Sequence, residues 1–294
     1  MKRRDRIRWF TGILAALLSF LVGCSSLPKR PVEEVGIGRQ ASAFHHAGLK
    51  HYHDGGYDKA SRYFQRAVGL YGSVDNRPGV ATTMASLGRA RLAQGELGAA
   101  ESCFQYANDV SRGIDRADLQ AQALGGLGAV ALAREQPDEA LNWLEAALAL
   151  PLANPSSERA VLLHDLGSAF WKLGEISAAE ANLRRALAMH ESLRDWRGLA
   201  GDCFMLAKLL AATGDHDQAS RLALRALGND KKAENPLGVA HDLTLLGELA
   251  ADSQSLDEAT GYFRRAELAW RAVGRTSEAD QLASRRQAWQ KSTP

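Results

Sequence analysis

Small apolar residues recur along this chain at a regular spacing. Six copies of one pattern follow each other, with first residues 40, 40, 39, 40 and 40 positions apart. The first residue of every copy is an alanine: Ala41, Ala81, Ala121, Ala160, Ala200 and Ala240. Position 27 is also alanine in every copy: Ala67, Ala107, Ala147, Ala186, Ala226 and Ala266. A period between about 20 and 50 residues predicts a solenoid, in which stacked units share one continuous core.

Within each copy, the apolar positions have the spacing of two amphipathic helices. A large residue stands beside a small one at positions 7 and 8, as in Leu87-Gly88, and a bulky residue such as Phe104 stands at position 24. Position 15, where the first helix should end, is glycine in four copies, and Glu135 and Gln254 replace it in the other two. A short polar residue three positions later is expected to cap the second helix in five copies: Asp58, Asp138, Ser177, Asp217 and Asp257.

This pattern resembles the tetratricopeptide repeat, a helix–turn–helix unit that stacks into a right-handed superhelix. The resemblance covers residues 41–279, with a period of 40 residues instead of the ~34 of better-known members. It implies an all-α fold, a right-handed superhelical solenoid of about six 40-residue repeats. Residues 280–294 continue a helical pattern and are expected to form a capping helix over the last repeat.

The start of the chain follows a different pattern. Five basic side chains precede an apolar run of 14 residues, from Trp9 to Val22. As a helix this run would span about 21 Å, short of the ~30 Å hydrocarbon core of a bilayer, so a secretory signal is predicted. The run ends in Leu21-Val22-Gly23-Cys24, which resembles the lipobox of bacterial lipoproteins.

The lipobox resemblance implies a lipoprotein signal peptide over residues 1–23 and acylation of Cys24. Several acyl chains would make the membrane attachment durable. Ser25, rather than aspartate, follows the cysteine, which favours the outer membrane, facing the periplasm. Residues 24–40 are expected to be the lipidated N-terminus and a flexible tether. The alternative is an ordinary cleaved signal with an unmodified cysteine.

Composition argues against nucleic-acid binding and catalysis. The formal net charge is +2, but the first 23 residues carry +4 of it, which leaves the remainder near −2. A nucleic-acid-binding domain usually has a basic patch or stripe. The sequence contains no recognisable Ser/His/Asp or Cys/His set, so we expect neither enzyme activity nor a cofactor. The segment Gly36-Ile37-Gly38-Arg39-Gln40-Ala41 matches a dinucleotide-binding loop only formally, because no strand precedes it.

Four histidines are candidates for a metal site, and two cysteines are candidates for a disulfide. His45, His46, His51 and His53 cluster in the first copy, but no two of them are four residues apart. His46 and His53 would be separated by about 10.5 Å along a helix, so no metal site is expected. Cys103 and Cys203 lie in the second and fifth copies, too far apart for a disulfide. Both are expected to pack as small apolar groups.

In the resembled family, the first helix of each repeat lines a concave groove. The candidate groove residues are His45, His46, Arg89, His164, Trp171, Phe204, Lys208 and His241. Trp171 and Phe204 are candidate anchors for an apolar or extended segment, although they could instead pack against adjacent helices. Likewise, small residues of the middle copies, such as Gly125 and Gly126, could serve tight packing or leave room for a ligand. The lysine and asparagine clamp of chaperone-binding members is absent.

These features together predict a lipid-anchored periplasmic adaptor or scaffold. It would bind protein partners in cell-envelope assembly, for example in pilus biogenesis or in scaffolding of wall enzymes. The alternative is a glycan- or small-molecule-binding module that uses the aromatic part of the groove.

Overall fold

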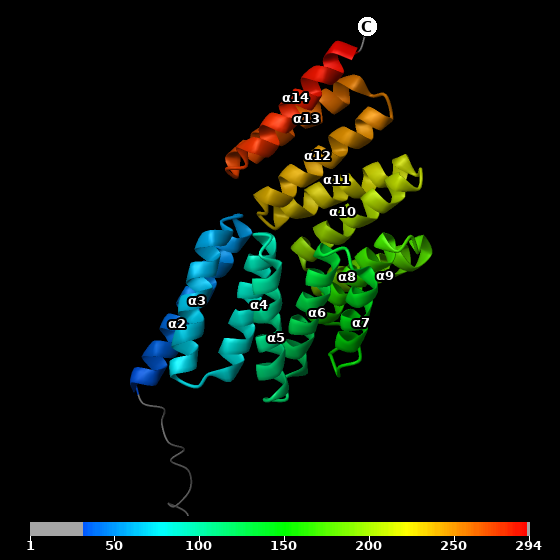
Figure 1. Ribbon diagram of the computed structural model, residues 1–294. Helices are drawn as coiled ribbons and strands as arrows, with labels where there is room; N and C mark the ends of the chain where they lie inside the picture. Colours follow the sequence, from blue (N-terminus) through cyan, green and yellow to red (C-terminus); the bar gives the residue numbers. More distant parts are fainter. Residues whose placement is uncertain (1–31, 293–294) are drawn as a thin grey trace, which may run out of the picture. The chain divides into compact units, whose positions relative to one another are not determined.

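The computed structural model describes the backbone of residues 32–292 and the side chains of residues 36–287. This part of the chain contains thirteen α-helices and no strand (Figure 1). In chain order the helices are α2 (Val32–His53), α3 (Tyr57–Ser73), α4 (Arg77–Ala93), α5 (Leu97–Arg112), α6 (Ala117–Ala133), α7 (Pro137–Leu148), α8 (Ser157–Lys172), α9 (Ile176–Leu193), α10 (Trp196–Ala212), α11 (His216–Lys232), α12 (Pro236–Asp252), α13 (Leu256–Ala272) and α14 (Thr276–Ser292). None of these described helices has the length and apolarity needed to cross a membrane.

Each predicted copy forms one pair of helices joined by a short turn, from α2 and α3 to α12 and α13. From Gly38 onward the described helices form one compact unit. Every helix from α3 to α13 packs against the next helix in the chain (Figure 1). The first helices of neighbouring repeats also contact each other, for example α4 with α6 and α6 with α8. The prediction of an all-α solenoid of helix pairs is confirmed.

Helix packing explains why alanine recurs at regular positions in the six repeats. The alanines at positions 1, 20 and 27 of all six copies are at most 1 % exposed. A larger side chain at such a contact would force neighbouring helices apart. The small residue at position 8 acts in the same way, since a Cβ on Gly88 would lie 2.8 Å from Phe104 Cε1 and one on Gly247 would lie 2.5 Å from Phe263 Cδ1.

The turn inside each repeat depends on one residue in the left-handed region. Gly55, Gly95, Gly174 and Gly214 have φ between 76° and 93°. Glu135 and Gln254, which stand at the same position, adopt φ of 60° and 58° despite their side chains. A residue with a Cβ is strained in this conformation. The predicted end of the first helix is therefore confirmed in all six repeats.

The predicted caps of the second helices were wrong by two residues. The second helix begins two residues after the left-handed residue, so Asp58, Asp138 and their equivalents lie in its first turn rather than at its cap. There a carboxylate interacts favourably with the positive end of the helix dipole. The residue that does cap α11 is Asp215, whose Oδ1 accepts from the Gln218 backbone N–H at 3.0 Å.

Two predicted boundaries also shift. The tether was expected to reach residue 40, but α2 begins at Val32. No proline interrupts residues 32–53, so nothing prevents the helix from continuing toward the N-terminus. At the other end, α14 begins at Thr276, four residues before the expected start of the capping helix. The predicted signal peptide and Cys24 lie outside the described residues.

Cys103 and Cys203 are both buried and free, as predicted. Burial raises the pKa of the Cys203 thiol to about 12 and raises that of Cys103 as well. Both thiols are therefore protonated at neutral pH and behave as small apolar groups.

Candidate functional site

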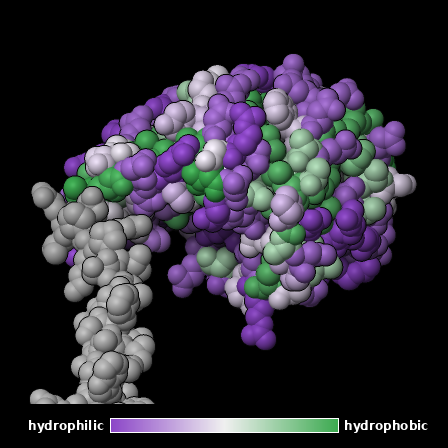
Figure 2. Space-filling view, turned by 90° about the horizontal axis from the view of Figure 1, so that it is seen from below, coloured by the Kyte–Doolittle hydropathy of each residue, from purple (hydrophilic) through white to green (hydrophobic). Residues whose placement is uncertain are grey.

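A cavity of about 270 Å³ opens among the first helices of the second, third and fourth repeats. α6 lies between α4 and α8, because it contacts both. Arg89 of α4 lines one side of the cavity, whereas Glu158, Val161 and Asp165 of α8 line the other. The Val161 side chain is large and apolar, yet 50 % exposed. On the face shown in Figure 2, apolar residues lie in several separate patches among polar ones.

The floor of the cavity depends on two adjacent glycines of α6. A Cβ on Gly126 would lie 2.2 Å from Phe104 Cε1, and one on Gly125 would lie 2.9 Å from Leu162 Cδ2. Gly126 therefore lets the Phe104 ring of the preceding repeat pack under α6. Both alternatives left open by the sequence apply here, since the glycines serve tight helix packing and also line the cavity.

The first repeat contains two of the predicted groove residues, His45 and His46, and neither lines this cavity. His45 Nδ1 and Thr83 Oγ1 form a hydrogen bond of 3.0 Å, and the His45 ring lies 5.5 Å from that of Phe64. Burial lowers the pKa of His45 to about 4, with smaller contributions from His46 and the Arg89 charge. The His45 side chain is thus neutral at physiological pH and joins the first repeat to the second, whereas His46 is exposed.

An aromatic cluster lies farther along the chain, on α8, α10, α12 and α13. Lys208 Nζ lies 5.6 Å from the Trp171 ring centroid and 5.7 Å from that of Phe204. The exposed His241 ring packs edge-on against Trp270 with centroids 4.7 Å apart. Trp171 and Phe204 are half-buried and pack on the apolar core, so packing accounts for part of each ring while the Lys208 ammonium covers another part.

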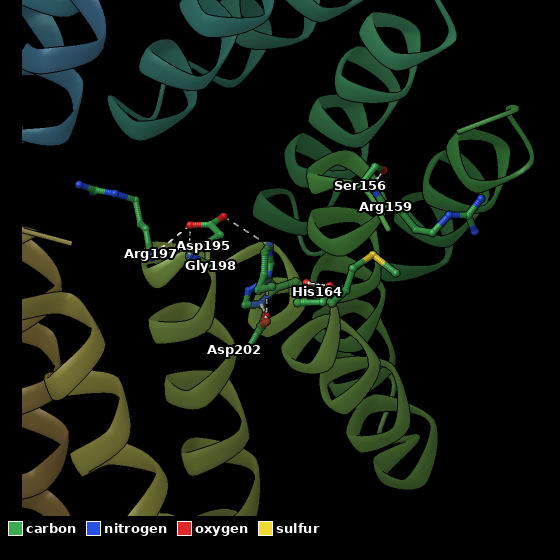
Figure 3. A network of polar contacts seen from close by, with 10 residues as sticks. Ser156, Arg159, His164, Asp195, Arg197, Gly198 and Asp202 are labelled. Carbon is green, nitrogen blue, oxygen red and sulfur yellow. Dashed lines mark hydrogen bonds and ion pairs between the residues drawn. The ribbon is translucent and has the colours of Figure 1, made fainter. Parts of the chain in front are cut away.

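The remaining predicted groove residue, His164, belongs to a buried polar network (Figure 3). His164 Nδ1 donates to Asp202 Oδ1 at 2.7 Å, and His190 Nδ1 donates to Asp202 Oδ2 at 2.7 Å. Burial opposes protonation of His164, but the hydrogen bond to Asp202 and the charge of Asp165 outweigh it and raise the His164 pKa. Asp202 is 0 % exposed, so this histidine is committed to joining repeats four and five.

Two residues of this region were not anticipated from the sequence. Asp202 bridges two histidines, and Trp270 supports His241. Each lies on a different helix from the histidine it meets, so only the packing of the helices reveals it. Within the described part of the chain, no three His, Cys, Asp or Glu side chains are grouped as metal ligands.

Comparison with known proteins identifies the repeat. A tetratricopeptide repeat family model matches residues 39–112 and 119–192, which together make up half of the chain. The chain belongs to the tetratricopeptide repeat family. Proteins of this family mediate protein–protein interactions, and their scaffold is generally non-catalytic. None of the curated proteins compared with this tetratricopeptide repeat protein matches it.

Solved structures share the fold of this tetratricopeptide repeat protein at low sequence identity. BtubC from P. vanneervenii is 19 % identical, with a TM-score of 0.57 over 76 % of this chain and 91 % of that chain. A Rap protein complexed with competence and sporulation factor is 14 % identical, with a TM-score of 0.62 over 84 % and 74 %. Pseudomonas aeruginosa pilF is 16 % identical, with a TM-score of 0.50 over 84 % and 99 %.

Proposed function

We propose that this protein is a lipid-anchored periplasmic adaptor that binds protein partners through the cavity between α4, α6 and α8. The observation that carries the proposal is the composition of this cavity. Its apolar floor is flanked by charged side chains on two different helices. Such a surface suits a protein segment, because apolar side chains supply binding energy while charges set orientation.

The proposed anchor rests on the amino-acid sequence. A basic head, a 14-residue apolar run and the Gly23-Cys24 junction together have the features of a lipoprotein signal. Anchoring through Cys24 would hold the repeats at the membrane surface, and Ser25 favours the outer membrane. A tethered scaffold raises the local concentration of whatever it binds, and this suits a role in cell-envelope assembly such as pilus biogenesis or wall-enzyme scaffolding.

Two experiments test the proposal. Affinity purification of the full-length protein from crosslinked envelopes should recover specific protein partners at stoichiometric levels. Replacing Cys24 with alanine should release the protein into the soluble periplasmic fraction, whereas a Cys103→Ala variant should remain with the membrane. Membrane retention of Cys24→Ala would contradict the lipid anchor, and an absence of co-purifying partners would contradict the adaptor role.

The second candidate function is glycan or small-molecule binding. It is favoured by the half-buried rings of Trp171 and Phe204, which present polarised aromatic faces beside Lys208. Soluble wall fragments should then raise the melting temperature of the wild-type protein but not that of a Trp171→Ala variant. No shift with either protein would leave the adaptor as the remaining proposal.

A further inference from the structure

The α4 side of the cavity carries a positive charge without a carboxylate partner. Arg89 is half-buried, and its Nη2 donates to Ser86 Oγ at 3.2 Å. It forms no ion pair with any residue between 36 and 287, where side chains are described. Burial, followed by nearby cations that include Arg89, lowers the pKa of His45 and of His53. The Arg89 guanidinium lines the cavity and has no carboxylate partner there, so it can pair with an anionic ligand.

The α8 side is acidic. Asp165 is half-buried and makes no hydrogen bond or ion pair with any described residue. The neighbouring His164 is hydrogen-bonded to Asp202 instead. Burial raises the pKa of Asp165 to about 6. Glu158, on the same side, accepts from Gln122 Nε2 at 3.1 Å through Oε1 and also lines the cavity. The carboxylates on this side can therefore pair with a cationic group of a ligand.

The general spacing of packed helix axes sets the length of a segment that could extend from α4 to α8. α4 and α8 are separated by α6, and packed helices lie about 8–10 Å apart. Two such spacings amount to about 16–20 Å, which five or six residues of extended chain would span at ~3.3 Å each. Midway along this path, Gly125 and Gly126 of α6 line the same cavity as the exposed Val161 of α8.

We propose that the cavity recognises an extended protein segment with an acidic side chain, an apolar side chain and a basic side chain in that spatial order. The acidic group pairs with Arg89, the apolar one packs over Gly125 and against Val161, and the basic one pairs with Asp165 and Glu158. This recognition pattern rests on the proposed function, because it specifies the chemistry of the protein segment bound there. Paired charges at the two ends would orient the segment and exclude partners of uniform charge.

Synthetic peptides provide the test. Three fluorescent peptides of equal length carry a central leucine flanked, five residues apart, by glutamate and lysine, by two glutamates, or by two lysines. Their affinities for the full-length protein in detergent are measured by fluorescence anisotropy. The mixed-charge peptide should bind at least about tenfold more tightly than either control. This comparison uses the wild-type protein alone, so it does not depend on the folding of a variant.

Charge reversal then assigns the two ends. Arg89→Glu should shift the preference to the two-lysine peptide, and Asp165→Lys should shift it to the two-glutamate peptide. Arg221→Glu, an exposed change on α11, should leave the wild-type order unchanged. Affinities within about twofold of each other, no binding of the mixed-charge peptide, or an unchanged order in Arg89→Glu would each overturn the proposal.

The outcomes for this pattern and for the proposed function are separable. If envelope crosslinking captures the same protein partners with wild type and with Arg89→Glu, the adaptor role stands and the charge pattern is overturned. If wall fragments stabilise the protein while none of the peptides binds, both are overturned in favour of a glycan-binding module.

Discussion

His190 and Asp202 join the fourth repeat to the fifth through a hydrogen bond between two buried side chains. His190 Nδ1 lies 2.7 Å from Asp202 Oδ2, and the residues are 2 % and 0 % exposed. Asp230 and Asp242 occupy the equivalent positions between the fifth and sixth repeats. Buried polar side chains thus occupy two successive repeat junctions, where burial makes their pairing important to stability.

Replacing Asp202 with alanine should lower the free energy of unfolding by about 3–5 kcal/mol, since it leaves two histidines without their buried acceptor. Urea denaturation followed by circular dichroism would measure this loss. Asp252→Ala, an exposed change on α12, should stay within about 0.5 kcal/mol of wild type. A loss no larger than that of the control would contradict the structural role assigned to Asp202.

The Asp230–Asp242 junction should make stability depend on pH. Burial and the neighbouring Asp230 carboxylate raise the pKa of Asp242 to about 8. The folded state therefore binds this proton more tightly than the unfolded chain, in which the pKa is about 3.9. Its stabilising contribution is complete below about pH 4 and is lost as the pH rises through about 8.

Asp242→Asn replaces the titrating carboxyl group with an uncharged amide and should flatten the dependence of stability on pH. At about pH 8 the variant should be more stable than wild type by about 2 kcal/mol, and near pH 4 the two should agree. A smaller slope below about pH 6 should persist, because Asp165 has a raised pKa of about 6 in both proteins. Parallel pH profiles of urea midpoints for the two proteins would argue against a protonated Asp242.

Gly126→Ala should destabilise the protein by about 1–3 kcal/mol, because the new methyl group collides with the Phe104 ring under α6. Gly69→Ala is the matched control. It lies inside α3 with no atom within 4 Å of a new Cβ, and it should stabilise by about 0.5–1 kcal/mol through helix propensity. Thermal unfolding of both variants would show opposite signs, and equal shifts would contradict the packing assigned to Gly126.

Glu135→Gly and Gln254→Gly should each stabilise the protein by about 1 kcal/mol, because they relieve a left-handed backbone with φ near 60°. The reverse change, Gly95→Ala, introduces a Cβ at φ 79° and should destabilise by a similar amount. Chemical denaturation of the three variants provides the comparison. If glycine lowered stability at residues 135 and 254, the strain assigned to these turns would be wrong.

The helix pairs were predictable because the same local requirement recurs in every repeat. Alanines such as Ala60 and Ala100 are 0 % exposed where helices touch most closely, so their period marks the contacts directly. The left-handed turn was predictable even at Glu135, because its position in the period outweighs its own propensity. The cap at Asp215 was missed because the aspartate two residues later is equally plausible as a helix-start signal.

The site was only partly predictable, for a physical reason. Arg89 was assigned to the groove and lines the cavity. Its counterpart Asp165 belongs to a repeat two units away, and the cavity joining them exists only through the stacking of α4, α6 and α8. His164 was also expected to face a ligand, but its ring nitrogen is engaged by Asp202 in the next repeat. The partners of a side chain at the junction between two repeats depend on the residues of the neighbouring repeat, which the repeat period does not specify.

The central claim is that a protein segment occupies the cavity in the cell envelope, and site-specific photocrosslinking tests it most directly. A photoreactive residue in place of Val161, which is 50 % exposed inside the cavity, is compared with one in place of Leu224, which is 49 % exposed on α11. We predict a discrete protein adduct at position 161 that is absent at position 224 and reduced by Arg89→Glu. Equal labelling at both positions, or no protein adduct at position 161, would contradict the claim.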